Sequence, residues 1–146
     1  MADYYDEYGG CIGEGSMVKM GDGTFRKVEN LKKDDVIETL NGEKAKIRCV
    51  MMTKLSEDVE MVVFPSGLMI TKYHPVIYGG KWQFPTDIFK PKKVNISAYY
   101  NFVLDKGHTM TINGIQCVTL GHNFVGDVIE HDYLGSEKVL RDLEKA

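Results

Sequence analysis

The stretch Tyr8–Thr24, "YGGCIGEGSMVKMGDGT", places a cysteine directly after two glycines and directly before a β-rich pattern. A cysteine that only fills a core normally sits inside an apolar strand, and Cys11 does not. The letters that follow it, "MVKM-GDG-TFRKV", are typical of two short strands around an Asp-Gly turn. We therefore expect a thiol at an exposed chain junction, shortly before a β-hairpin.

Turn signals continue outward from this stretch at short, fairly even intervals. Asn41-Gly42 lies between two alternating segments and is the strongest hairpin signal in the chain. Further hairpins are predicted around Pro65-Ser66-Gly67 and Gly79-Gly80, between residues 99–104 and 108–112, and around Asn113-Gly114. These segments have strand length and lack sustained helical periodicity, so the sequence predicts a nearly all-β domain.

The C-terminal end differs from the rest of the chain. Ser136 is a good N-cap, and "EKVLRDLEK" places Val139, Leu140 and Leu143 on one side, so we expect a short amphipathic helix from about Ser136. The segment after His122 carries too many apolar residues for a solvated tail. We expect it to dock on the core.

Composition narrows the class of protein. A chain of 146 residues with 43% hydrophobic and 27% charged residues fits one globular domain. The net charge of −3, without a basic stripe, argues against a nucleic-acid partner. No run approaches about 20 apolar residues, and the acidic N-terminus is not a signal peptide, so we expect neither a membrane partner nor export. Three widely spaced cysteines argue against a disulfide framework and fit the cytoplasm.

Cys11 can carry out a specific reaction at this position. A cysteine can attack the carbonyl of the residue before it and convert its own peptide bond into a thioester. This N-to-S shift is uphill because amide resonance is lost. It needs a donor for the departing amide nitrogen and a group that stabilises the oxyanion. Gly9 and Gly10 allow the twisted backbone that the shift requires, which makes Gly10–Cys11 the candidate cleavage bond.

Two further segments offer the proton donor. "MITKYHPV", residues 69–76, contains Thr71 and His74, which can reach one site only if the chain bends before Pro75. His108 follows a turn at the start of a strand and could approach the junction from the other side. Taken alone, the TxxH segment is also compatible with a coincidental loop motif, and His108 with a structural histidine beside a hairpin.

Taken in order, the motifs are far more specific. Cys11 is followed in order by "GSMVKMGDG", "LKKDDVIETLNG", "TKYHPV" and "YNFVLDKGHTMTING". In this series of motifs the chain resembles the Hint superfamily, the fold shared by inteins and hedgehog autoprocessing domains. The resemblance covers about residues 11–122. The tail, "CVTLGHNFVGDVIEHDYLGSEKVLRDL", is similar to the Vint family, whose intein-like domains occur beside von Willebrand factor type A domains.

The resemblance implies a horseshoe-shaped β-fold and a set of roles. Cys11 matches the first-residue nucleophile, Thr71 and His74 the block that polarises and protonates the scissile amide, and His108 the histidine of the C-terminal block. Residues 1–10 would be an upstream flanking segment, and residues 11–146 the domain, with an extension from about residue 124. The implied partners are a covalently linked upstream polypeptide and a small-molecule or protein nucleophile as acyl acceptor. No cofactor is implied.

The sequence also departs from the family. Splicing inteins end at a His-Asn pair whose positions fall here on Val118 and Thr119. The pair His122-Asn123 lies four residues later, and Phe124 after it offers no nucleophile. Hedgehog domains use an aspartate for which "RCVMMTKL" offers no carboxylate, and Asn101 stands where some inteins carry an assisting aspartate.

These departures leave two hypotheses open. The main one is autocatalytic cleavage before Cys11 without splicing, either slow or triggered by a ligand. The alternative is a catalytically degenerate Hint fold that acts as a binding or scaffold module. Cys117, His122 and His131 are close in sequence, but packing explains them better than a metal site, and we expect no metal. Trp82 is expected to pack under a loop.

Overall fold

The computed structural model describes residues 11–124, 126, 128–129, 138 and 140–141. Thirteen strands form nearly all of the regular secondary structure in these residues. The strands are β1 (Ile12–Gly13), β2 (Met17–Lys19), β3 (Phe25–Lys27), β4 (Val36–Glu38), β5 (Lys44–Lys54), β6 (Val59–Val63), β7 (Met69–Ile70), β8 (Val76–Tyr78), β9 (Lys81–Gln83), β10 (Lys92–Val94), β11 (Ala98–Leu104), β12 (Thr109–Ile112) and β13 (Ile115–Val118). Three single 3-10 turns lie at η1 (Val28–Asn30), η2 (Leu40–Gly42) and η3 (Pro85–Asp87). The prediction of a nearly all-β domain is confirmed. No helix in these residues is long and apolar enough to cross a membrane.

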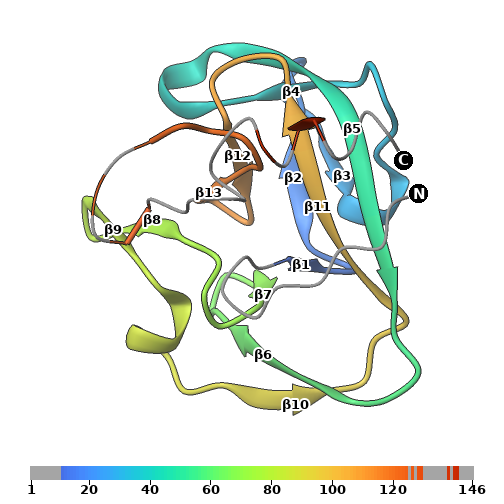
Figure 1. Ribbon diagram of the computed structural model, residues 1–146, viewed down its shortest axis with the longest axis vertical. Helices are drawn as coiled ribbons and strands as arrows, with labels where there is room; N and C mark the ends of the chain where they lie inside the picture. Colours follow the sequence, from blue (N-terminus) through green and yellow to red (C-terminus); the bar gives the residue numbers. More distant parts are fainter. Residues whose placement is uncertain (1–10, 125, 127, 130–137, 139, 142–146) are drawn as a thin grey trace.

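The described strands form two antiparallel sheets (Figure 1). One sheet has the order β10-β6-β7-β1-β11-β5-β4, and the other has the order β3-β2-β12-β13-β8-β9. Groups of one to four consecutive strands thus alternate between the two sheets. This alternation brings loops from distant parts of the chain to the same region.

Most of the predicted hairpins are confirmed, and one is wrong. The β2–β3, β4–β5, β6–β7, β8–β9 and β12–β13 pairs form around the expected turns. The predicted pairing of residues 99–104 with 108–112 does not form, because β11 and β12 belong to different sheets. β1 and β5 occupy both edges of β11, so β12 pairs with β2 and β13 instead.

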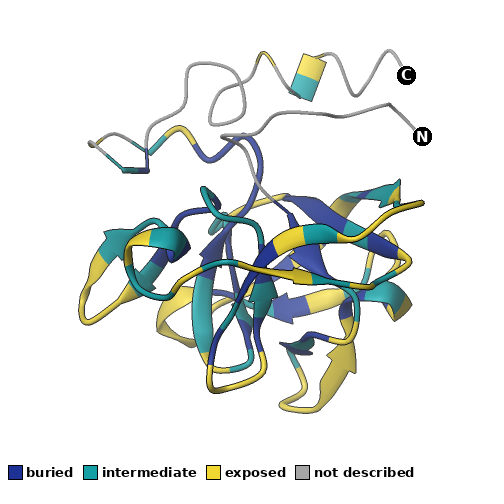
Figure 2. Ribbon diagram, turned by 90° about the horizontal axis from the view of Figure 1, so that it is seen from below, coloured by how far each residue is buried: buried dark blue, intermediate teal, exposed yellow. Residues whose placement is uncertain are grey.

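A single large hydrophobic cluster lies between the sheets. Its fully buried members come from both sheets and include Ile37, Ile47, Phe102 and Ile112. Figure 2 shows the buried residues gathered on the inward parts of the strands, with exposed residues on the outer loops. Burial of such side chains stabilises the fold by about 1.5–3 kcal/mol each, so this cluster is the main stabilising element.

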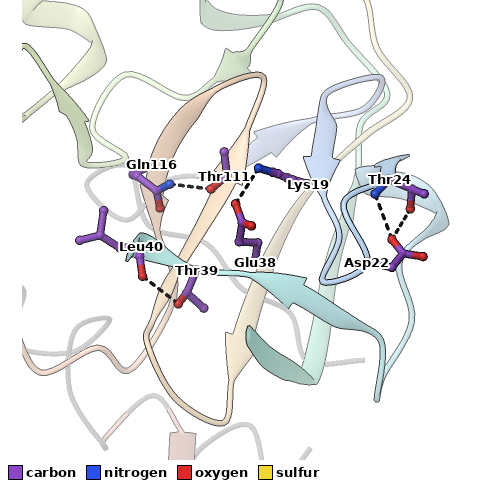
Figure 3. A network of polar contacts seen from close by, with 8 residues as sticks. All are labelled: Lys19, Asp22, Thr24, Glu38, Thr39, Leu40, Thr111 and Gln116. Atoms are coloured by element: carbon purple, nitrogen blue, oxygen red, sulfur yellow. Dashed lines mark hydrogen bonds and ion pairs between the residues drawn. The ribbon is translucent and has the colours of Figure 1, made fainter. Parts of the chain in front are cut away.

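Polar contacts join the two sheets where β4 lies against β2 and β12, and Figure 3 shows one of them, between Lys19 and Glu38. Lys19 of β2 forms an ion pair with Glu38 of β4 at 3.0 Å. Beside it, the amide of Leu40 donates to Thr109 Oγ1 of β12 at 3.0 Å. The ion pair is partly exposed, so it contributes only about 0–1 kcal/mol to stability.

The described part of the C-terminal segment packs on the core. Ile129 is buried, and the side chain of Leu140 contacts the small cluster of Met51, Val103 and Leu120. Lys138, Leu140 and Arg141 have helical backbone, while most of the helix predicted from about Ser136, including Ser136 itself, lies outside the described residues. The expectation that the tail docks is therefore confirmed for the residues that the structure describes.

The contact between Gly121 and Leu140 gives a test of this docking. Gly121 has φ +69°, and a Cβ there would lie 2.8 Å from the Leu140 side chain. Gly23 has φ +87° with nothing within 4 Å. Alanine at either position costs about 1–2 kcal/mol for the left-handed backbone. We expect Gly121→Ala to lose about 1 kcal/mol more than Gly23→Ala, because it also overpacks Leu140.

Urea unfolding of both variants, alone and combined with Leu140→Ala, measures this difference. The extra loss in Gly121→Ala should disappear when Leu140 is truncated. Equal losses in the two glycine variants, or an extra loss that persists with Leu140→Ala, would show that the tail does not pack at Gly121.

Candidate functional site

Cys11 directly precedes β1, which lies between β7 and β11. Ile12 pairs with Ile70 on one side and with Tyr100 on the other, so this two-residue strand is fixed on both edges. Gly13 makes the close approach possible, since a Cβ there would lie 2.9 Å from the side chain of Met69. The backbone that follows the candidate cleavage bond is therefore held rigidly.

Thr71 contacts the candidate cleavage bond directly. The amide nitrogen of Cys11, which is the nitrogen of the Gly10–Cys11 peptide bond, donates to Thr71 Oγ1 at 2.7 Å. The amide of Thr71 donates back to the Cys11 carbonyl at 3.0 Å. A hydroxyl at 2.7 Å can orient the amide and polarise its nitrogen. Of the sequence-predicted site residues, these two are in direct contact.

The thiol of Cys11 is not at an exposed junction, contrary to the expectation from the sequence. Only 4% of Cys11 is exposed. The pairing of β1 on both edges draws Cys11 into the sheet. Burial raises the pKa of the thiol far above its ordinary value, because the thiolate would lose its hydration.

His74 lies at the end of a turn that starts at Thr71. β7 ends at Ile70, and the amide of His74 donates to the Thr71 carbonyl at 3.4 Å, so the bend predicted before Pro75 is present. The ring of His74 is buried, and its Nε2 lies 2.7 Å from the carbonyl oxygen of Val118. A carbonyl only accepts, so Nε2 carries the proton, and Nδ1 is the atom that can take up and deliver a further proton.

His108 lies opposite the end of β13, the segment whose carbonyl contacts the His74 ring. The amide of Thr119 donates to the His108 carbonyl at 2.9 Å, one residue after the carbonyl that contacts His74. His108 has φ +52°, a conformation seldom adopted by residues other than glycine. Burial lowers the pKa of its imidazole, with Asp105 acting in the opposite direction and Arg48 in the same one. Hydrogen bonds thus link the regions of Cys11, Thr71, His74 and His108 in one series.

The ring of Phe124 lies between His108 and the displaced His-Asn pair, because it contacts the rings of both His108 and His122. His122 is buried and its Nδ1 accepts the amide of Phe124 at 2.8 Å, whereas Asn123 is exposed with φ +58°. The Phe124 ring stacks on His122 at 5.0 Å between centroids and meets His108 edge-on at 6.3 Å. Trp82 also contacts Phe124, at 6.0 Å, so it packs against the tail.

Sequence reasoning used Thr119 and Phe124 only to argue against splicing and missed their place at the site. For Thr119 the available signal was its position in place of the intein asparagine. Phe124 gave no signal of its own, because its contacts come from three separate segments.

A metal site, a disulfide and a cavity are further candidates, and none of them includes the predicted site residues in the part of the chain that the structure describes. In the part of the chain that the structure describes, no three His, Cys, Asp or Glu side chains are grouped as metal ligands, and His131 lies outside that part. All three cysteines are free. A cavity of about 520 Å³ lies near β5 and is lined by both basic and acidic residues together with Cys49 and Leu140, but its described lining contains none of the predicted site residues.

Comparison with known proteins identifies the family. The model of the Vint family, described as a Hint domain, matches residues 10–146. The chain belongs to the Vint family of Hint domains. No curated protein sequence matches this Vint domain.

Solved inteins share the fold of this Vint domain. The DnaB intein from Synechocystis sp. PCC 6803 has 16% identity and a TM-score of 0.58 over 75% of this chain and 98% of the intein. The Ssp DnaB mini-intein variant M86 has 14% identity and a TM-score of 0.61, over 82% of this chain and 97% of the mini-intein. A bacterial intein-like domain from Clostridium thermocellum has 15% identity and a TM-score of 0.57, over 75% of this chain and 97% of that domain. At these identities the likeness establishes the fold alone.

The environment of His108 predicts a pH dependence of stability. Its pKa is below the ordinary 6.5 in the folded Vint domain, mainly because burial disfavours the imidazolium. The folded state therefore binds fewer protons than the unfolded state between the two pKa values, so the free energy of unfolding falls as pH drops through about 6.5. We expect NMR titration to show His108 protonating below the ordinary value, and His108→Gln to lessen this pH dependence. Titration at or above 6.5 would contradict the assigned burial.

Proposed function

We propose that this Vint domain cleaves the Gly10–Cys11 peptide bond through an N-to-S acyl shift, without splicing. The observation that supports this most strongly is the hydrogen bond of 2.7 Å from the Cys11 amide nitrogen to Thr71 Oγ1. The scissile nitrogen is thereby in contact with the first residue of the TxxH segment. The substrate is the upstream polypeptide to which the domain is covalently linked.

The first step exchanges one bond for another. Cys11 Sγ attacks the carbonyl carbon of Gly10, the bond from that carbon to the Cys11 nitrogen breaks, and the nitrogen becomes a free amine. The products are a thioester at Sγ and a new α-amine on Cys11, and the thiol proton is the one that the nitrogen gains. Thr71 orients the amide through the 2.7 Å contact. Distortion of the amide removes part of the resonance that opposes the shift.

His74 delivers the proton to the departing nitrogen. The Val118 carbonyl fixes its tautomer through Nε2, and Nδ1 is then the proton-transferring atom. The turn from Thr71 to His74 joins this ring to the residue that contacts the scissile nitrogen. An amine leaves far more readily when it is protonated as the bond breaks, which is the usual contribution of a general acid.

The buried thiol makes the reaction slow in the absence of a trigger. Burial raises the pKa of Cys11, so very little thiolate exists near neutral pH. Cleavage then depends on transfer of the thiol proton during the attack, or on an event that exposes the thiol. The same burial is what favours the alternative hypothesis, a degenerate Hint fold that serves as a binding or scaffold module.

Splicing is excluded from the proposal on chemical grounds. Val118 and Thr119 stand where an intein carries its terminal His-Asn pair, and neither side chain can cyclise as asparagine does. Asn123 is exposed, and Phe124 after it has no group that could accept an acyl chain.

Cys11→Ala should abolish release of residues 1–10, because no sulfur remains to form the thioester. Cys49→Ala is the matched control, since Cys49 is a free, half-buried thiol in a different strand and should leave release unchanged. Mass spectrometry after incubation of the full chain with dithiothreitol measures the release. Release from Cys11→Ala would contradict the assigned nucleophile, and a parent protein that remains intact would favour the scaffold hypothesis.

His74→Ala should slow dithiothreitol-induced release by about 10²–10⁴-fold, the usual contribution of a positioned general acid. Lys72→Ala, in the same turn but with its amine on the surface beside Glu60, should cleave at the parent rate. Circular dichroism would verify that both variants fold. If folded His74→Ala released residues 1–10 at the parent rate, its proposed role would be wrong.

A further inference from the structure

Thr119 has a buried hydroxyl without a hydrogen-bond partner in the part of the chain that the structure describes. Only 3% of the residue is exposed, and its Oγ1 has no access to solvent. Buried hydroxyls are almost always hydrogen-bonded, to protein or to an ordered small molecule. Threonine also stands here in the place of the asparagine that splicing inteins use. Both facts indicate that the hydroxyl has a ligand.

His108 presents a second atom of the same kind. Its Nδ1 is buried and lacks a hydrogen-bond partner among the described residues. The backbone at His108 has φ +52°, and such conformations persist mainly where the surrounding structure requires them. Burial lowers the pKa of the ring, so the imidazole is neutral near neutral pH and can accept a proton.

These two residues lie opposite each other. β12 and β13 pair Thr109 with Val118, and the amide of Thr119 extends this pairing by donating to the His108 carbonyl at 2.9 Å. His108 lies just before β12 and Thr119 just after β13, so this hydrogen bond makes the two residues direct neighbours at the open end of the hairpin. A water molecule needs two to four polar partners, and two neighbouring side chains can supply two of them.

The pair of residues adjoins the proposed thioester site. The carbonyl of Val118, just before Thr119, lies 2.7 Å from Nε2 of His74. The amide of Leu120, just after Thr119, donates to the carbonyl of Phe102 in β11 at 3.0 Å. β11 is the strand that pairs with β1 directly after Cys11. Thr119 is thus attached on one side to the TxxH segment and on the other to the sheet that holds the nucleophile.

Aromatic rings cover His108 on the side of the tail. The Phe124 ring meets His108 edge-on, stacks on His122, and contacts Trp82. This cover places apolar rings on the tail side of His108, where a small nucleophile such as water needs no opening of the ring contacts.

We infer that His108 and Thr119 hold the water molecule that hydrolyses the thioester, so that the acyl acceptor of this Vint domain is water. This inference rests on the proposed function. The water oxygen bonds to the Gly10 carbonyl carbon, the bond from that carbon to Cys11 Sγ breaks, and its electrons stay on sulfur. One water proton passes to His108 Nδ1 and then to the Cys11 thiolate. The other water proton is lost as the new carboxyl group ionises, and the α-amine of Cys11 takes it up. The products are a carboxylate on Gly10 and, on Cys11, a free thiol and a protonated α-amine.

Hydrolysis of the full chain in H₂¹⁸O identifies the acceptor. Without added thiol, the released fragment of residues 1–10 should carry one ¹⁸O atom in its new carboxylate, as read by mass spectrometry. A fragment without the label would overturn the inference. A parent protein that dithiothreitol cleaves but that does not hydrolyse by itself would overturn it as well, while leaving the proposed thioester intact.

Thr119→Val tests the hydroxyl with little change in shape. We expect spontaneous hydrolysis to fall about tenfold, the usual loss for one hydrogen bond. Dithiothreitol-induced release should stay within about twofold of the parent, because it reports thioester formation and brings its own nucleophile. Thr119→Ser should restore hydrolysis. The unfolding midpoint of Thr119→Val should not fall, since a buried hydroxyl without a protein partner is replaced by a methyl group.

The two readouts separate the possible failures. A parent protein that dithiothreitol does not cleave overturns the proposed function and the inference together. Normal dithiothreitol-induced release with unchanged hydrolysis in Thr119→Val overturns only the inference. A parallel fall of both rates in Thr119→Val indicates a purely structural role for Thr119 and also overturns the inference.

Discussion

The pairing of β1 on both of its edges is the constraint on which the rest of the site depends. A strand of two residues cannot hold its position by its own hydrogen bonds, so β7 and β11 must hold it from both sides. Gly13 permits this, because any side chain there would overlap Met69. The result is a cysteine whose backbone is fixed against Thr71 and whose thiol is withdrawn from water. The rigidity and the burial of Cys11 therefore have the same cause.

The division of the chain into two sheets brings the remaining groups to this point. Because β11 is paired on both edges, the chain must leave its sheet after Leu104 and begin β12 in the other. The crossing places His108 opposite Thr119 and the end of β13 beside His74. Residues separated by more than 40 positions in sequence become linked by short hydrogen bonds as a consequence of strand order.

The segment beyond β13 adds a layer that a minimal Hint core does not need. Leu120 forms a parallel bridge with Val103, and Leu140 packs on the adjoining cluster. Between these points, Phe124 covers His108 and His122. Packing of this kind couples the environment of His108 to the docking of the tail, so the stability of the tail and the chemistry of the site are connected through shared apolar contacts.

By itself the sequence determined the local elements and the family. Asp-Gly and Asn-Gly turns between alternating segments specify hairpins through short-range backbone preferences, and the spacing of the Cys, TxxH and His108 motifs specified the Hint resemblance. Only the tertiary structure decided which strands share a sheet, that Cys11 is buried, and that Thr119 and Phe124 contact His108. Those features depend on contacts between segments far apart in the chain, and local patterns carry no information about strand order or about which edges are already occupied.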